Sequence, residues 1–205
     1  MIKLWPSFGL LWLAWLVWLY MTFFAERSAR RTRVAASVLS AIILSALEVP
    51  FFYENQVNAG FVFVGWLGFW HIFNNAGGSL LRRFFSMLTC AFCFAFFELF
   101  LLYDPVWTVL DKQWLVGSIL FFLTLLLAKR TIDRLSYIAG GMVQGAFLVM
   151  LVLKKVNMSY MLGTMIQADI LVVVLLLHGG WHFMKAGIRK LEAKVLQKQG
   201  WTGRV

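Results

Sequence analysis

Seven apolar runs divide the 205-residue chain, and their lengths constrain its fold more than any other feature. About twenty apolar residues in an α-helix cross a bilayer, and a lipid-embedded span must satisfy its backbone hydrogen bonds internally. We therefore predict an all-α membrane protein, a seven-transmembrane-helix bundle. The expected helices cover residues 4–24, 34–53, 59–78, 84–103, 114–129, 135–153 and 161–184. The fifth run is short and the third ends in polar residues, so six spans are the main alternative.

The composition agrees with a membrane protein. The chain is 61% hydrophobic and 14% charged, with a mean hydropathy of +0.79, whereas soluble domains carry roughly 25% charged residues. Only the C-terminal tail lacks an apolar run, so a separate soluble domain is not expected. Residues 1–184 are predicted to form the bundle, and residues 185–205 a basic cytoplasmic tail.

The N-terminus lacks the pattern of a cleaved signal peptide. Lys3 precedes the first apolar run, whereas a cluster of arginines from Arg27 to Arg33 follows it. A secretory signal has its positive charges before the apolar core and a small-residue cleavage site after it. We therefore expect the first helix to be retained.

The basic residues alternate between the loops in a way that predicts orientation. Fifteen of the 19 Lys and Arg residues fall in every second connection or in the C-terminal tail. The positive-inside rule then places the N-terminus outside and the C-terminus in the cytoplasm, which requires an odd number of spans. The net charge of +10 thus indicates contact with anionic lipids. Membrane lipids and other membrane proteins are the expected partners, and nucleic acid is not.

The tail has an amphipathic pattern. Ile188, Leu191, Val195 and Leu196 recur at helical spacing, with basic residues between them. The pattern predicts that the tail extends the seventh helix and then lies along the inner headgroups. A solvated basic tail is the alternative.

Three carboxylates lie within the predicted spans, namely Glu48, Glu98 and Asp169. Charged groups at membrane depth are costly and usually face other helices. The topology places all three in the outer half, with Gln144 able to join them at mid-depth. No Lys or Arg within a span offers a counter-ion, which favours protonated carboxyls. They form either a proton or ligand site, as in a small proton-coupled carrier, or structural contacts between helix ends.

The chain has three histidines, all expected in the cytoplasmic half. His178 and His182 are four residues apart and share a helix face, and His71 lies at similar depth in the third helix. Three histidines and a water form a known catalytic zinc arrangement. Asp169 and His178 are half a turn out of phase on a straight helix, so the carboxylates and the histidines are expected to form separate sites.

The three histidines resemble those of the seven-helix zinc hydrolases that include alkaline ceramidases and the progestin and adiponectin receptors. That family also has a Ser one turn before the third His and an Asp near it. Leu67 stands at the Ser position, and no Asp lies between His71 and Asp104. Without an acid, a zinc site loses its supporting contacts. We expect no cofactor, with zinc at the histidines as the alternative.

Small residues predict close helix packing. Ser37, Ala41 and Ser45 form a stripe in the second helix, and Gly141 and Gly145 form a GxxxG motif in the sixth. Cys90 and Cys93 form a CxxC motif inside the fourth apolar run, where two thiols behave as small hydrophobes rather than as a redox pair.

The segment FELFLLYDPVWTVLDKQW, residues 97–114, resembles the YphA family of small multi-pass membrane proteins from Gram-positive spore-formers. The resemblance extends to WLAWLVWLYMTFF and AIILSALEVPFF, and so covers most of the chain. It implies a protein of the bacterial cytoplasmic membrane, with a link to sporulation or spore revival as a hypothesis. We predict a non-enzymatic binding or scaffold component; a zinc-dependent hydrolase and a proton-coupled carrier are the alternatives.

Overall fold

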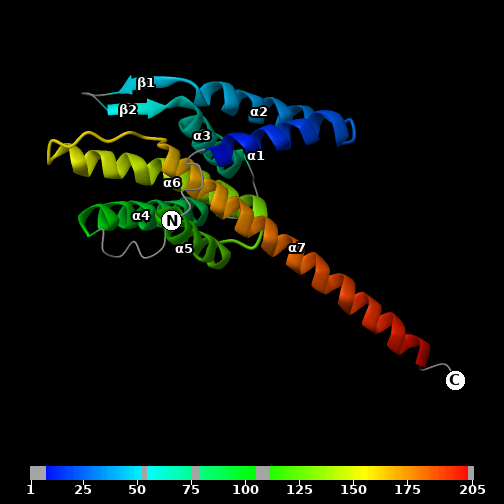
Figure 1. Cartoon of the computed structure of the whole chain (residues 1–205). Helices are drawn as coiled ribbons and strands as arrows, with labels where there is room; N and C mark the ends of the chain where they lie inside the picture. The colour runs from blue at the N-terminus through cyan, green and yellow to red at the C-terminus, as the bar shows by residue number, and fades with distance from the viewer. Residues whose placement is uncertain (1–7, 52–54, 75–78, 105–110, 203–205) are drawn as a thin grey trace.

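The structure is a computed structural model that describes residues 8–51, 55–74, 79–104 and 111–202. This part of the chain contains seven α-helices, as the apolar runs predict (Figure 1). A short π-helix, η1 (Tyr20–Phe24), continues the first of them. The helices are α1 (Phe8–Leu19), α2 (Ala29–Ser45), α3 (Ala59–Asn74), α4 (Leu80–Tyr103), α5 (Lys112–Leu127), α6 (Thr131–Lys154) and α7 (Met165–Thr202).

Three helices of the described chain are long and apolar enough to cross a membrane, namely Leu80–Tyr103, Thr131–Lys154 and Met165–Glu192. A helix of 24 residues is about 36 Å long, compared with about 30 Å for the hydrocarbon core. Three shorter apolar segments, Gly9–Phe24, Ala59–Asn74 and Lys112–Leu127, accompany them.

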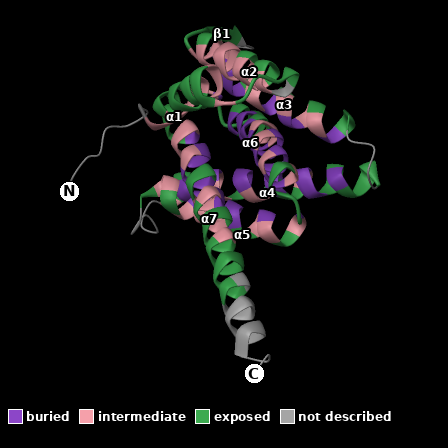
Figure 2. Cartoon of the chain, turned by 90° about the vertical axis from the view of Figure 1, so that its right-hand side faces the viewer, coloured by how far each residue is buried: buried purple, intermediate pink, exposed green. Residues whose placement is uncertain are grey.

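Helix α6 lies at the centre and packs closely against α3 and α4. A Cβ atom on Gly145 would lie 2.6 Å from the carbonyl oxygen of Ala91, and one on Gly141 would lie 2.7 Å from Cβ of Cys90. The GxxxG motif therefore permits close approach to α4, as predicted. A Cβ atom on Gly68 of α3 would likewise lie 2.8 Å from the carbonyl oxygen of Ser136 in α6. Burial is concentrated in this interior (Figure 2).

The glycine contacts give the relative directions of α3, α4 and α6. Along α4 and α6, the glycine contacts advance together from Cys90 to Ala91, so these two helices are parallel. Along α3, contacts with α6 run backwards, from Val143 near Gly65 to Ser136 near Gly68. Figure 1 shows that consecutive helices alternate in direction, so that the turns α1–α2, α3–α4 and α5–α6 lie at one end, here termed the arginine end.

At each of these turns, an arginine in the first turn of the following helix binds the end of the preceding helix. Arg31 Nη1 donates to the Ala25 carbonyl oxygen at 2.9 Å, and Arg134 Nε donates to that of Ala128 at 2.7 Å. Arg83 Nη1 donates to the Ile72 carbonyl oxygen at 3.3 Å. Each guanidinium therefore binds a carbonyl at the C-terminal end of the preceding helix, where the helix dipole favours positive charge.

The expected second helix over 34–53 is wrong at both ends. Helix α2 ends at Ser45, and an antiparallel hairpin of β1 (Glu48–Phe51) and β2 (Asn55–Asn58) follows it. Pro50 explains the change, because proline disfavours helical backbone in the residue before it and breaks a helix interior. Val57 also pairs with Leu162 of the α6–α7 loop. We term this opposite end the hairpin end.

Other predicted boundaries shift by several residues. Helix α4 begins at Leu80 and α6 at Thr131, so Arg82, Arg83 and Arg134 lie within first turns rather than in loops. Helix α3 ends at Asn74, and residues 75–78 of the predicted third helix lie outside the described residues. Helix α7 begins at Met165 and continues through the predicted tail to Thr202.

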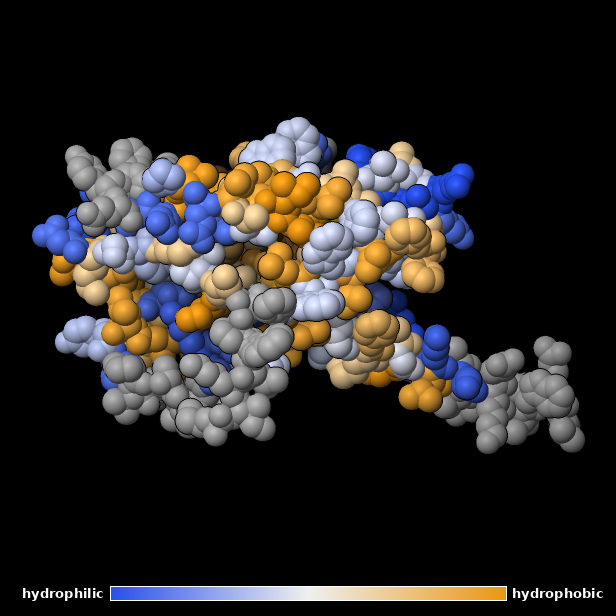
Figure 3. All heavy atoms as spheres, turned by 45° about the horizontal axis from the view of Figure 1, so that its top comes forward, coloured by the Kyte–Doolittle hydropathy of each residue, from blue (hydrophilic) through white to orange (hydrophobic). Residues whose placement is uncertain are grey.

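The surface carries many exposed apolar side chains. Phe96, Phe122 and Leu126 are 60%, 63% and 86% exposed. In Figure 3, hydrophobic residues gather across the middle of the visible face and hydrophilic ones toward its sides. This distribution is typical of a protein surrounded by lipid.

Candidate functional site

Of the three carboxylates predicted as site residues, the one on Glu98 in α4 is the most buried. Its side chain is 5% exposed, and Oε2 accepts a hydrogen bond from Lys112 Nζ at 2.7 Å. Lys112 is the first residue of α5. The expectation that these carboxyls lack a counter-ion is therefore wrong for Glu98. The other carboxylate oxygen, Oε1, is buried and accepts no hydrogen bond from the residues that the structure describes.

A chain of hydrogen bonds lies beside this ion pair. Gln167 of α7 donates from Nε2 to the Tyr160 hydroxyl at 2.6 Å, and its Oε1 accepts from the Gly163 N–H at 2.7 Å. Burial and the nearby Glu98 carboxylate raise the pKa of Tyr160, so its phenol stays protonated at neutral pH. Gln167 is 1% exposed. The ion pair thus joins α4 to α5, and the hydrogen bonds beside it join α7 to the α6–α7 loop.

Glu48 and Asp169 lie elsewhere. Glu48 is exposed at the start of β1 and does not continue the helical stripe from Ser37, because α2 has already ended. Asp169 is half-buried on α7 and faces α1, since its Oδ1 lies 3.7 Å from the Cβ position of Gly9. The structure thus places the three carboxylates at different positions rather than in one cluster. Gln144 is separate as well, with a buried Oε1 that is not hydrogen-bonded within the described part of the chain.

His71 pairs with an acid that the sequence comparison did not suggest. Its Nε2 lies 3.3 Å from Asp133 Oδ1, in the first turn of α6. The absence of an Asp soon after His71 in the sequence is therefore compensated in space by a residue 62 positions away. The pair links α3 to α6 at the arginine end.

His178 and His182 have different surroundings. His178 is 3% exposed, its Nδ1 lies 3.0 Å from the Val174 carbonyl oxygen, and its Nε2 lies 3.4 Å from Thr124 Oγ1 of α5. Its ring also makes an edge contact with Phe121. His182 is exposed. Within the described residues, no three His, Cys, Asp or Glu side chains form a group that could hold a metal ion.

In the CxxC motif, Cys90 is buried in the bundle and Cys93 is half-buried. Cys90 and Cys93 are free thiols on α4, and Cys90 packs against Gly141 of α6. Their positions fit the prediction that they fill space as small hydrophobes.

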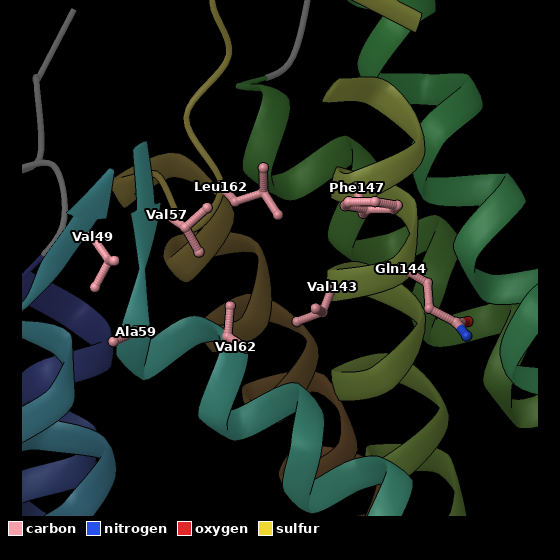
Figure 4. A pocket seen from close by; sticks show the side chains of 8 residues that line it. All are labelled: Val49, Val57, Ala59, Val62, Val143, Gln144, Phe147 and Leu162. Carbon is pink, nitrogen blue, oxygen red and sulfur yellow. The ribbon is translucent and has the colours of Figure 1, made fainter. Parts of the chain in front are cut away.

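An apolar groove lies between the hairpin, α3 and α6 (Figure 4). Its volume is about 490 Å³, and one lining residue, Gln144, carries a polar side chain. The amide of Gln144 points away from the apolar side chains in the close view. The other lining residues are Val49, Val57, Ala59, Val62, Val143, Phe147 and Leu162.

Comparison with known proteins identifies the family. The model of the family described as YphA-like integral membrane protein matches residues 7–203. The chain belongs to this family. It is 28% identical over 158 residues to the uncharacterized protein YphA of Bacillus subtilis (strain 168), covering 73% of this chain and 74% of that protein. No solved structure matches the chain. The membrane prediction and the recognised family are thus confirmed, and family membership brings no described activity.

Sequence reasoning missed the partners more than the sites. The predicted spans 84–103 and 114–129 leave Lys112 in the connection between them, and no predicted site contains Tyr160 or Gln167. Hydropathy gives no signal for them, because their role depends on where α5 and α7 begin. Lys112 follows Glu98 by 14 residues, across one connection between helices. The opposite charges of these two residues are the signal in the sequence that indicates their pairing.

Proposed function

We propose that this protein is a non-enzymatic binding component of the bacterial cytoplasmic membrane, which holds one acyl chain of a membrane lipid in the groove between the hairpin, α3 and α6. In this proposal all seven helices cross the membrane, the N-terminus lies outside, and the arginine end faces the cytoplasm. No metal or cofactor takes part.

The apolar groove carries the proposal. Binding sites for small molecules usually enclose about 300–1,000 Å³ and are lined mainly by apolar side chains. The groove has a volume of about 490 Å³ and a lining of valines, Ala59, Phe147 and Leu162. In an integral membrane protein, the surrounding molecules with matching chemistry are lipid acyl chains. A branched, apolar lining favours such a chain over a charged solute.

The distribution of charge supports the proposed orientation. Arg31, Arg83 and Arg134 bind backbone carbonyls at the arginine end, and the exposed Arg82 and Arg130 accompany them. Such an excess of basic residues is typical of cytoplasmic loops. The 16-residue helices α3 and α5 would be about 24 Å long, and local thinning of the bilayer can accommodate helices of that length.

The histidine geometry supports a function without catalysis by zinc. Both ring nitrogens of His178 already face protein oxygens, and His71 faces Asp133. His71 and His178 would have to leave these contacts to meet His182 at one ion.

Lipid photocrosslinking tests the groove. Full-length protein in nanodiscs would be irradiated with a phospholipid that carries a diazirine on one acyl chain, and the labelled peptides identified by mass spectrometry. We expect labelling of peptides that contain Val62 and Phe147. Val62→Trp should fill the groove and reduce this labelling several-fold, because Val62 is 39% exposed and lines it.

The matched control is Val17→Trp, on a lipid-facing valine of α1 with 40% exposure. It should leave groove labelling unchanged. Uniform labelling over all exposed helices, or equal effects of the two variants, would exclude the groove as a lipid site.

A further inference from the structure

The last part of α7 extends beyond the bundle as a single helix (Figure 1). We term the described side chains from His182 to Lys194, without Ala193, the arm. Four apolar side chains of the arm are uncovered: Phe183, Met184, Ile188 and Leu191 are 78%, 47%, 46% and 65% exposed. Helical spacing places these four on one face, because successive residues turn by about 100°.

The arm is strongly basic. Lys185 and Arg189 lie opposite the apolar face, while Lys190 and Lys194 lie along its edge. Glu192 is the single acidic residue of the arm. A helix with an apolar face flanked by Lys and Arg fits the surface of an anionic bilayer, where long basic side chains reach the headgroups while their stems stay in contact with acyl chains.

Three glycines in this region have no packing role. Among the described residues, a Cβ atom on Gly179, Gly180 or Gly187 would meet no other part of the protein within 4 Å. In contrast, a Cβ atom on Gly60, Gly117 or Gly145 would lie within 3 Å of a neighbouring helix. Glycine is unfavourable in a helix interior because it adds backbone freedom. Gly179, Gly180 and Gly187 therefore contribute backbone freedom rather than close packing, and they mark places where α7 can bend.

We propose that the arm is a hinged membrane-surface helix that folds down from α7 and binds anionic phospholipid headgroups. The proposal rests on the membrane crossing of α7 proposed above. It commits to a lipid surface rather than a second copy of the chain, because two such arms side by side would bring like charges together. Continuity with a membrane-spanning helix keeps the arm next to that surface.

Spin labels on two faces of the arm test the proposal. A nitroxide at Leu191→Cys or at Arg189→Cys would be introduced into full-length protein that carries Cys90→Ala and Cys93→Ala. The protein would be placed in nanodiscs of phosphatidylcholine alone or mixed with phosphatidylglycerol. Collision rates with oxygen and with a water-soluble nickel complex then report the depth of each label.

We expect the Leu191 label to become several-fold more accessible to oxygen, relative to nickel, in the anionic discs, while the Arg189 label stays in water. Lys185→Gln, Arg189→Gln, Lys190→Gln and Lys194→Gln combined should return the Leu191 label to water, as should high salt. Gly179→Ala, Gly180→Ala and Gly187→Ala combined should reduce its burial by stiffening the helix.

Several results would overturn the proposal. A Leu191 label that stays in water in anionic discs excludes the lipid surface, and dipolar broadening between labels would indicate a second copy instead. Burial that does not depend on lipid charge excludes recognition of anionic headgroups, and burial unaffected by the glycine substitutions excludes the hinge. Both disc faces are accessible, so the result is independent of the proposed orientation and of lipid in the groove.

Discussion

At the scale of single residues, the ion pair between Glu98 and Lys112 determines how α4 meets α5. Glu98 is almost fully buried, whereas the Lys112 side chain is 28% exposed. The two members of the pair therefore differ in what happens when the other is removed. An isolated carboxylate loses more hydration on burial than an ammonium group that still reaches water.

We predict that Lys112→Met destabilises the protein more than Glu98→Gln does. Removing one partner of a buried ion pair costs about 3–5 kcal/mol. We expect Lys112→Met to approach about 3 kcal/mol, and Glu98→Gln to cost about 1–2 kcal/mol, because the ammonium can be partly solvated. Thermal unfolding in detergent, followed by circular dichroism, would compare the two variants.

The double variant Lys112→Met/Glu98→Gln serves as the control for this pair. It should be more stable than Lys112→Met alone, because it no longer buries an unpaired charge. Equal losses in both single variants, with additive loss in the double variant, would show that the pair contributes little.

At the scale of elements, the helix positions could be predicted and several of their contacts could not. Apolar runs indicate where a helix is buried, and these runs correspond to all seven helices of the described chain. The predicted spans begin directly after Arg83 and Arg134, but both arginines lie within helices, and their guanidinium groups reach back to the end of the preceding helix. Hydropathy carries no information about such contacts.

The hairpin and the partner of His71 show a second limit of prediction from a single sequence. The segment from Glu48 to Phe51 is apolar enough for a helix, and Pro50 was the available sign against one. Asp133 is distant from His71 in sequence, and the two meet because α3 and α6 pack antiparallel. Tertiary packing decides these pairs, so a single sequence does not predict them.

The arginine contacts lead to a prediction at this scale. Arg134→Met should destabilise the protein by about 1.5–3 kcal/mol, the usual range for a hydrogen bond to a charged group. The variant removes the donor to the Ala128 carbonyl oxygen, which lies at the C-terminal end of α5. Arg130→Met is the matched control, because Arg130 is exposed at the same turn. Similar unfolding temperatures for the two variants would contradict a structural role for Arg134.

At the scale of the whole molecule, the fold separates a basic end from an end capped by the hairpin. The groove lies near the hairpin, whereas the His71–Asp133 pair and the arm belong to the opposite end. Because the helices alternate in direction, the orientation of one helix across the membrane fixes the orientation of all the others. The proposed binding of an acyl chain and the proposed binding of headgroups then occur at opposite membrane surfaces.

Labelling in intact cells tests this arrangement most directly. Met158 in the α6–α7 loop and Ile132 in the first turn of α6 are equally exposed, at 50% and 49%. Each would be replaced by Cys in a chain with Cys90→Ala and Cys93→Ala, and treated with a membrane-impermeant maleimide. We predict that Met158→Cys reacts in intact cells, whereas Ile132→Cys reacts only after the cells are opened. Reaction of Ile132→Cys in intact cells, alone or together with Met158→Cys, would contradict the proposed orientation.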